Sequence, residues 1–129
     1  DDMHSFREFH KRILEEVFIE LEQTEYIIHT ADYARDGLNK IYEHSKEPYD
    51  TIIMDLQMED DFSPQYAGEW LVEQIKKMPS YYKTRIIIVS GTYNIKQIAE
   101  NLNVEYVPKR IACTDINTYK EFLIGRKRA

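Results

Sequence analysis

Three short apolar runs in the second half of the chain each lead into a polar residue: Asp55, Ser90 or Lys109. The runs are residues 49–58 (YDTIIMDLQM), 85–91 (RIIIVSG) and 104–109 (VEYVPK). Uninterrupted runs of this length are typical of strands covered on both faces, as in a parallel sheet. In open α/β sheets, ligands and chemistry collect at the carboxyl ends of the strands. We therefore predict that the three polar residues meet at one edge of one sheet.

Apolar residues spaced three and four apart predict helices before, between and after these runs. In the second predicted helix, Leu38, Ile41 and Tyr42 are expected to face inward. A short apolar stretch at residues 26–28 predicts one more strand. Strands that alternate with helices indicate an α/β class with a doubly wound parallel sheet. The predicted helices cover residues 5 to about 22, 34–43, 68–77, 95–102 and 115–123.

Length and charge narrow the possible functions. The 129 residues suit a single domain over residues 1–129, with 125–129 (GRKRA) as a tail or linker. The formal net charge of -6 argues against direct binding to nucleic acid, which needs a basic face. No apolar run approaches the roughly 18 residues of a membrane span, so we expect a cytoplasmic protein. Cys113, the one cysteine, excludes an internal disulfide and is interpreted as a small buried or half-buried residue.

In chain order, the acidic pair Asp1-Asp2, Asp55, Ser90-Gly91 and Lys109 resembles the receiver domain of two-component response regulators, in the CheY-like superfamily. The resemblance extends over the whole chain. Each feature is weak alone, because many strands end in an acidic residue, but their combination is specific. The resemblance implies the flavodoxin-like receiver fold, whose five strands follow the order 2-1-3-4-5.

The resemblance also implies a chemistry. Asp55 would be the phosphoacceptor, receiving a phosphoryl group from the phosphohistidine of a histidine kinase or a histidine phosphotransfer domain. Mg²⁺ would be held by Asp1, Asp2, Asp55 and the backbone carbonyl of Gln57, while Lys109 offsets charge from the other side. The chemistry of the residues agrees with this metal site, because carboxylates that lie close together repel one another and a bound divalent cation offsets their charge. The only reactions would be self-catalysed phosphotransfer and autodephosphorylation, so no separate enzymatic activity is expected.

A conformational switch follows from the same resemblance. The Ser90 hydroxyl would donate a hydrogen bond to the phosphoryl group, and Tyr106 would fill the space that the Ser90 loop vacates. The output, including a possible homodimer, would use the face formed by the fourth helix, the last strand and the last helix. Tyr106 has a simpler interpretation as a strand aromatic residue that never moves.

The chain departs from the family pattern at its beginning. It starts at the acidic pair, where the family's first strand would already have ended, and that strand lies between the second and third strands of the sheet. We expect a longer parent chain with a short apolar strand before Asp1. A segment from a second copy of the chain is the alternative occupant of that position.

Smaller departures surround the predicted site. Residues 59–66 (EDDFSPQY) form an acidic loop beside the acceptor. This loop either affects the choice of kinase, shields the phosphoryl group, or is a tolerated surface insertion. Pro108 precedes Lys109 instead of following it, which leaves open how the lysine is aimed. Gln57 and Thr92, each two residues past a site residue, are expected to tune access of the hydrolytic water.

Two other functions compete with the phosphoacceptor. A pseudo-receiver would keep the fold as an interaction module without phosphorylation, and the acidic pair, Ser90 and Lys109 disfavour it. A haloacid-dehalogenase-type phosphatase also uses a strand-end aspartate, a hydroxyl residue and a lysine. That family expects a second aspartate where Gln57 stands, and its acidic pair comes last in the chain instead of first. Rapid turnover of phosphate esters would favour the phosphatase.

Overall fold

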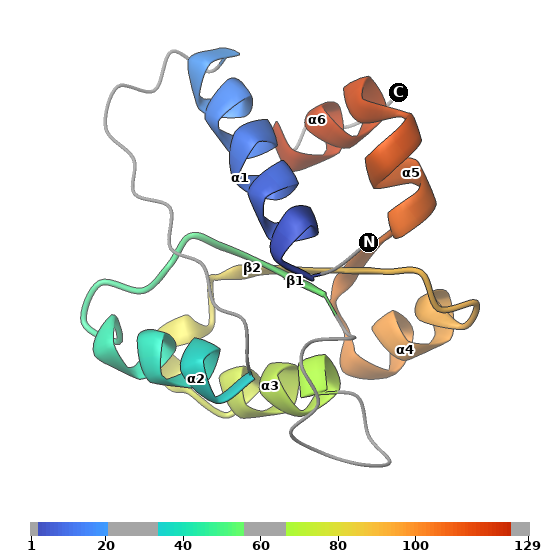
Figure 1. The fold of residues 1–129 in the computed structure, drawn as a ribbon. Coiled ribbons are helices and arrows are strands. Elements are labelled where there is room, and N and C mark those ends of the chain that lie inside the picture. Colours follow the sequence, from blue (N-terminus) through green and yellow to red (C-terminus); the bar gives the residue numbers. More distant parts are fainter. Residues whose placement is uncertain (1–2, 21–33, 56–66, 125–129) are drawn as a thin grey trace. The chain divides into compact units, whose positions relative to one another are not determined.

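The structure, a computed structural model, describes residues 3–20, 34–55 and 67–124 (Figure 1). The predicted strand at 26–28, the acidic loop at 59–66 and the tail at 125–129 lie outside the described residues. The chain divides into a helical unit, residues 1–30 and 110–129, and a sheet unit, residues 31–109. Each unit is described by itself.

Within its described residues, the sheet unit contains three parallel strands in the order β1-β2-β3. They arise from the three apolar runs: β1 is Thr51–Asp55, β2 is Arg85–Ser90 and β3 is Glu105–Pro108. Parallel strands need crossover connections, and α3 and α4 supply them here. The predicted α/β class with a parallel sheet is confirmed, and the three strands correspond to the last three of the expected order.

Burial differs between the strands. In β2, residues 86–90 are all buried, as the uninterrupted apolar run predicts. In β1 only Met54 is fully buried, whereas Ile52 and Ile53 are partly exposed. Ile52 and Ile53 stay partly exposed because β1 is at the edge of the described sheet, where it pairs with a strand on one side only.

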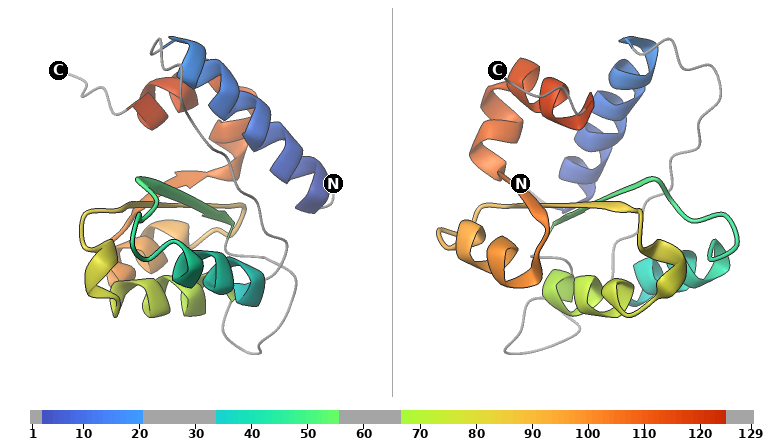
Figure 2. Two further views of the ribbon diagram at one scale, coloured as in Figure 1. Left: turned by 90° about the vertical axis from the view of Figure 1, so that its left-hand side faces the viewer. Right: turned by 180° about the vertical axis from the view of Figure 1, so that it is seen from behind.

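Three helices lie on one side of the sheet: α2 (Ala34–Glu43), α3 (Ala67–Lys76) and α4 (Ile95–Leu102) (Figures 1 and 2). α2 and α4 have the predicted bounds, and α3 begins and ends one residue earlier than predicted. The helices pack their apolar faces on Met54, Ile86 and Ile88 of the sheet.

The interior position predicted for Tyr42 is wrong, because its side chain is 56 % exposed. Ile41 is buried and Leu38 is half-buried against the core. Tyr42 lies about 100° around the helix from Ile41, which turns it out of the packed stripe. Ile41 also contributes its carbonyl, which accepts a 2.6 Å hydrogen bond from the buried Tyr81 hydroxyl. Tyr81 belongs to η1 (Pro79–Tyr81), a single 3₁₀ turn after α3.

The helical unit contains α1 (Met3–Glu20) and α6 (Ile116–Ile124), together with α5 (Lys109–Thr114) except for its first residue. α1 and α6 match predicted helices, whereas α5 was not predicted. Tyr119 on α6 has no exposed surface and forms a hydrogen bond with His10 Nε2 on α1. Burial raises the pKa of the Tyr119 hydroxyl, so the neutral phenol is the form the fold keeps. The interpretation of Cys113 as a buried residue is wrong, because it lies exposed on α5.

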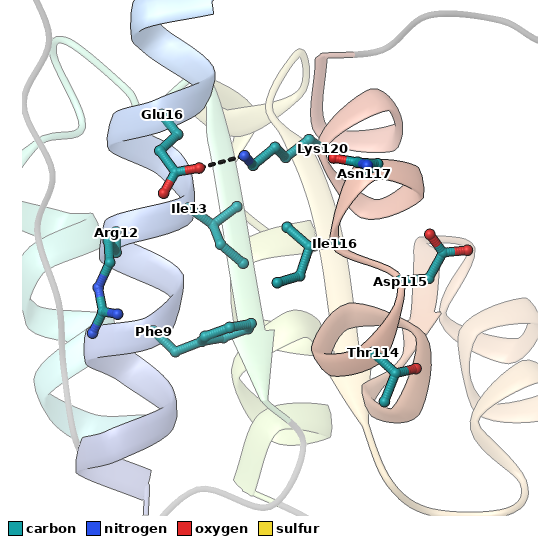
Figure 3. A pocket seen from close by; sticks show the side chains of 9 residues that line it. All are labelled: Phe9, Arg12, Ile13, Glu16, Thr114, Asp115, Ile116, Asn117 and Lys120. Carbon is teal, nitrogen blue, oxygen red and sulfur yellow. Dashed lines mark hydrogen bonds and ion pairs between the residues drawn. The ribbon is translucent and has the colours of Figure 1, made fainter.

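A hollow of about 500 Å³ lies between α1 and α6 in the helical unit (Figure 3). Ile13 and Ile116 approach each other across it, and the Glu16–Lys120 ion pair spans it at one end. Its lining mixes acidic, basic and apolar residues without a cluster of one chemistry. The residues are Phe9, Arg12, Ile13, Glu16, Thr114, Asp115, Ile116, Asn117 and Lys120.

Candidate functional site

Asp55 is the last residue of β1, so it stands at the carboxyl end of a strand in the parallel sheet. It pairs with Val89 of β2 in the strand register. Its side chain retains only 13 % of its surface. A carboxylate that has lost this much contact with water needs a charged or hydrogen-bonding partner.

Lys109 supplies that partner. Its Nζ lies 3.4 Å from Asp55 Oδ2, across 54 positions of sequence. Lys109 follows directly after β3, which lies beyond β2 from Asp55, so the side chain must reach across the end of the central strand. Pro108 before it therefore does not prevent the lysine from being aimed at the carboxylate. The contact is longer than the roughly 2.7–2.9 Å of a tight charge-assisted hydrogen bond. The lysine is therefore close to the carboxylate but does not form a short, strong hydrogen bond with it.

Ser90 is the last residue of β2, one position beyond the residue that pairs with Asp55. Its side chain is 1 % exposed. The Ser90 Oγ accepts a 3.2 Å hydrogen bond from the backbone N–H of Thr92. Because a hydroxyl both donates and accepts, this bond leaves the Ser90 proton available for another acceptor.

Tyr106 lies in the middle of β3, paired with Ile88, and is half-buried against the core of the sheet unit. It therefore already packs on the side of the sheet that carries α2, α3 and α4. Asp1, Asp2 and Gln57, the other predicted metal ligands, lie outside the described residues. Within the described ranges, no three histidine, cysteine, aspartate or glutamate side chains form a cluster that could hold a metal ion. Asp55 alone fits a carboxylate ligand for Mg²⁺, which commonly takes one or two carboxylates and completes its shell with water.

Sequence reasoning missed Asn94. The Thr92 hydroxyl donates a 2.8 Å hydrogen bond to Asn94 Oδ1, so side-chain hydrogen bonds connect the loop after Ser90 to the N-cap residue directly before α4. The signal was present in the sequence, because asparagine directly before an apolar helical pattern is typical of an N-cap.

Comparisons with known proteins identify the family of this chain. Residues 1–119 match the response regulator receiver domain, so the chain belongs to the response regulator receiver domain family. No curated protein matches the sequence. None of the described helices has the length and apolar character needed to cross a membrane.

Solved structures that share the fold include two response regulators. One is the phosphorylated cyanobacterial phytochrome response regulator RcpA, with a TM-score of 0.61 and 16% identity, covering 92% of this chain and 83% of that one. The other is the Mn²⁺-bound form of response regulator Rcp1, with a TM-score of 0.59 and 17% identity, covering 92% of this chain and 88% of that one. At these identities the likeness establishes the receiver fold alone.

Proposed function

We propose that this receiver domain is the phosphoacceptor of a cytoplasmic two-component system, taking a phosphoryl group on Asp55 from the phosphohistidine of a histidine kinase or a phosphotransfer domain. The supporting observation is the Lys109 ammonium, 3.4 Å from the Asp55 carboxylate at the carboxyl ends of parallel strands. In a member of the receiver family, this pair has the chemistry that the transfer requires.

The transfer is a displacement at phosphorus. An oxygen of the Asp55 carboxylate forms the new P–O bond as the P–N bond to the donor imidazole breaks, and the imidazole leaves with the electron pair and takes a proton. Catalysis of phosphoryl transfer consists mainly of positioning and charge stabilisation. Lys109 would offset negative charge on the phosphoryl oxygens. Ser90 would donate its hydroxyl proton to one of them.

Mg²⁺ would bind at Asp55 and neutralise charge on the transferring group. The predicted further ligands are Asp1, Asp2 and the Gln57 carbonyl. The protein's own contribution is to hold the Asp55 carboxylate at the end of its strand, beside Lys109 and largely withdrawn from water. The chain is expected to have no separate substrate, so its chemistry ends with loss of its own phosphoryl group.

The proposed response uses Ser90 and Tyr106. A hydrogen bond from Ser90 to the phosphoryl group would draw the loop after β2 toward Asp55. Tyr106, half-buried on the same side of the sheet as α4, would then pack further into the space that this loop leaves. A phosphoryl group can shift such a two-state equilibrium only to the extent that it interacts more favourably with one state than with the other.

The direct test is incubation of the 129-residue chain with acetyl phosphate and Mg²⁺, followed by mass spectrometry. We expect the mass of one added phosphoryl group, lost when a chelator removes the metal beforehand. A chain that keeps its original mass with the metal present would exclude the phosphoacceptor function and favour the pseudo-receiver.

Replacing Lys109 by methionine should slow formation of the adduct by about 100-fold, the usual effect of losing one preorganised group that stabilises transition-state charge. The rate is measured from the time course of the adduct mass. Lys46→Met, at an exposed position after α2, is the matched control and should react at the wild-type rate. Equal rates in the two variants would show that Lys109 has no role in the transfer.

A further inference from the structure

The N-terminus of α4 lacks the cap that its sequence provides. Asn94 occupies the N-cap position, yet its side chain makes no capping hydrogen bond to the helix. Its backbone, at φ -101° and ψ 26°, also departs from the extended conformation that capping residues usually adopt. The backbone N–H groups of Lys96 and Gln97, the usual partners of an N-cap side chain, therefore lack this acceptor.

The missing cap has a visible cause. Asn94 Oδ1 instead accepts the 2.8 Å hydrogen bond from the Thr92 hydroxyl. The backbone N–H of the same Thr92 donates to Ser90 Oγ at 3.2 Å. Thr92 thus connects the Ser90 hydroxyl with Asn94 Oδ1, the side-chain oxygen that would cap α4.

The segment between Ser90 and α4 has room to change conformation. Among the residues that the structure describes, no atom beyond its chain neighbours lies within 4 Å of the position that a Cβ on Gly91 would take. The Tyr93 side chain is 97 % exposed, so moving it breaks no packing. α4 itself is anchored to the core of the sheet unit by Ile95 and Ile98. The loop can therefore change conformation while α4 stays in place. An Asn94 side chain that changes its hydrogen-bond partner needs this combination.

We propose that Asn94 is a positioning residue with two alternative partners, the Thr92 hydroxyl before phosphorylation and the N-terminus of α4 after it. The inference rests on the proposed function. When Ser90 turns to a phosphoryl group on Asp55, Thr92 follows Ser90, and its bond to Asn94 breaks. Asn94 then returns to the extended backbone region, and its side chain accepts from Lys96 or Gln97. No covalent bond changes in this step.

This exchange would transmit the phosphorylation state to α4 without moving the body of the helix. The unphosphorylated protein has one Thr92–Asn94 bond and an uncapped helix, and the phosphorylated protein has a capped helix. Because both states keep one hydrogen bond on Asn94, their difference in free energy is small, and one event at Asp55 can shift the balance. The first turn of α4 is then more ordered in the phosphorylated form.

Amide hydrogen exchange at Lys96 and Gln97, measured residue by residue by NMR, tests the exchange of partners. In the 129-residue chain kept phosphorylated by excess acetyl phosphate and Mg²⁺, these amides should exchange roughly fivefold more slowly, the typical effect of gaining an N-cap. Thr92→Val should produce the same protection without any phosphodonor, because it frees Oδ1 of the Asn94 side chain. Asn94→Ala should accept phosphate and show neither increase in protection.

Asn101→Ala is the matched control, because it removes an exposed asparagine from the same helix away from its N-terminus. It should keep the phosphorylation-dependent protection. A phosphate adduct without slower exchange at Lys96 and Gln97 would overturn the inference and leave the proposed function intact. Absence of the adduct would overturn the proposed function. Unprotected amides in Thr92→Val would overturn the inference without reference to phosphate.

Discussion

Replacing Asp55 by asparagine is expected to abolish the phosphoryl adduct completely. The amide has nearly the shape of the carboxylate, so the carboxyl end of β1 should keep its structure, but it lacks the anionic oxygen that attacks phosphorus. It also removes the negative charge beside Lys109, whose Nζ is 3.4 Å from Asp55 Oδ2 in the native protein. The measurement is the mass of the intact chain after incubation with acetyl phosphate and Mg²⁺.

Asp50→Asn is the control for this substitution. Asp50 directly precedes β1 at its opposite end and is exposed, and its backbone carbonyl accepts a 2.9 Å hydrogen bond from the Arg85 N–H. This variant should gain the phosphoryl group as the native chain does. If Asp55→Asn gained the same mass, the acceptor would be another residue, and the assignment of Asp55 would be wrong.

Truncating Tyr119 to alanine is expected to lower the free energy of unfolding by about 3–5 kcal/mol, the range for removing a large aromatic residue from a core. Tyr119 is completely buried, and its ring lies edge-on to His10 with centroids 5.4 Å apart. The truncation would leave a cavity beside α1 and remove the hydrogen bond to His10. The midpoint of urea unfolding, followed by circular dichroism, measures the effect.

Two further variants separate the causes. Tyr119→Phe keeps the ring and loses only the hydroxyl, so the expected cost is about 1 kcal/mol. Tyr93→Ala removes a tyrosine side chain that is 97 % exposed and should change the free energy of unfolding by less than about 0.5 kcal/mol. Equal losses in Tyr119→Ala and Tyr119→Phe would contradict the packing argument and assign the stabilisation to the hydrogen bond.

Periodicity predicted the elements of this protein because it acts locally. β2 combines an uninterrupted apolar run with burial of residues 86–90, and α2 and α4 have the predicted bounds. The positions of Asp55 and Ser90 at strand ends followed from where the apolar runs stop. Local patterns failed where packing decides, as for Tyr42. Its spacing of four from Leu38 suits the inner face, but its side chain is 56 % exposed.

The sequence also failed to predict α5 and the exposure of Cys113, again because packing is not visible in local patterns. The short helix α5 lies between β3 and α6, where the sequence offers no apolar repeat long enough to identify a helix of six residues. Cys113 was interpreted from the usual burial of cysteine, but it falls on the exposed side of α5. Burial depends on which neighbours cover a residue, and residue type alone does not specify them.

The order of apolar runs along the chain determined, without coordinates, that a parallel sheet would present an aspartate, a serine and a lysine at the ends of its strands. Only the tertiary structure decided that Lys109 Nζ lies 3.4 Å from Asp55 Oδ2 and that Asn94 bonds Thr92 instead of capping α4. Apolar periodicity depends on neighbours a few positions apart, so it can be seen in the sequence. A contact across 54 positions depends on strand register and side-chain conformation, which exist only once the sheet has formed.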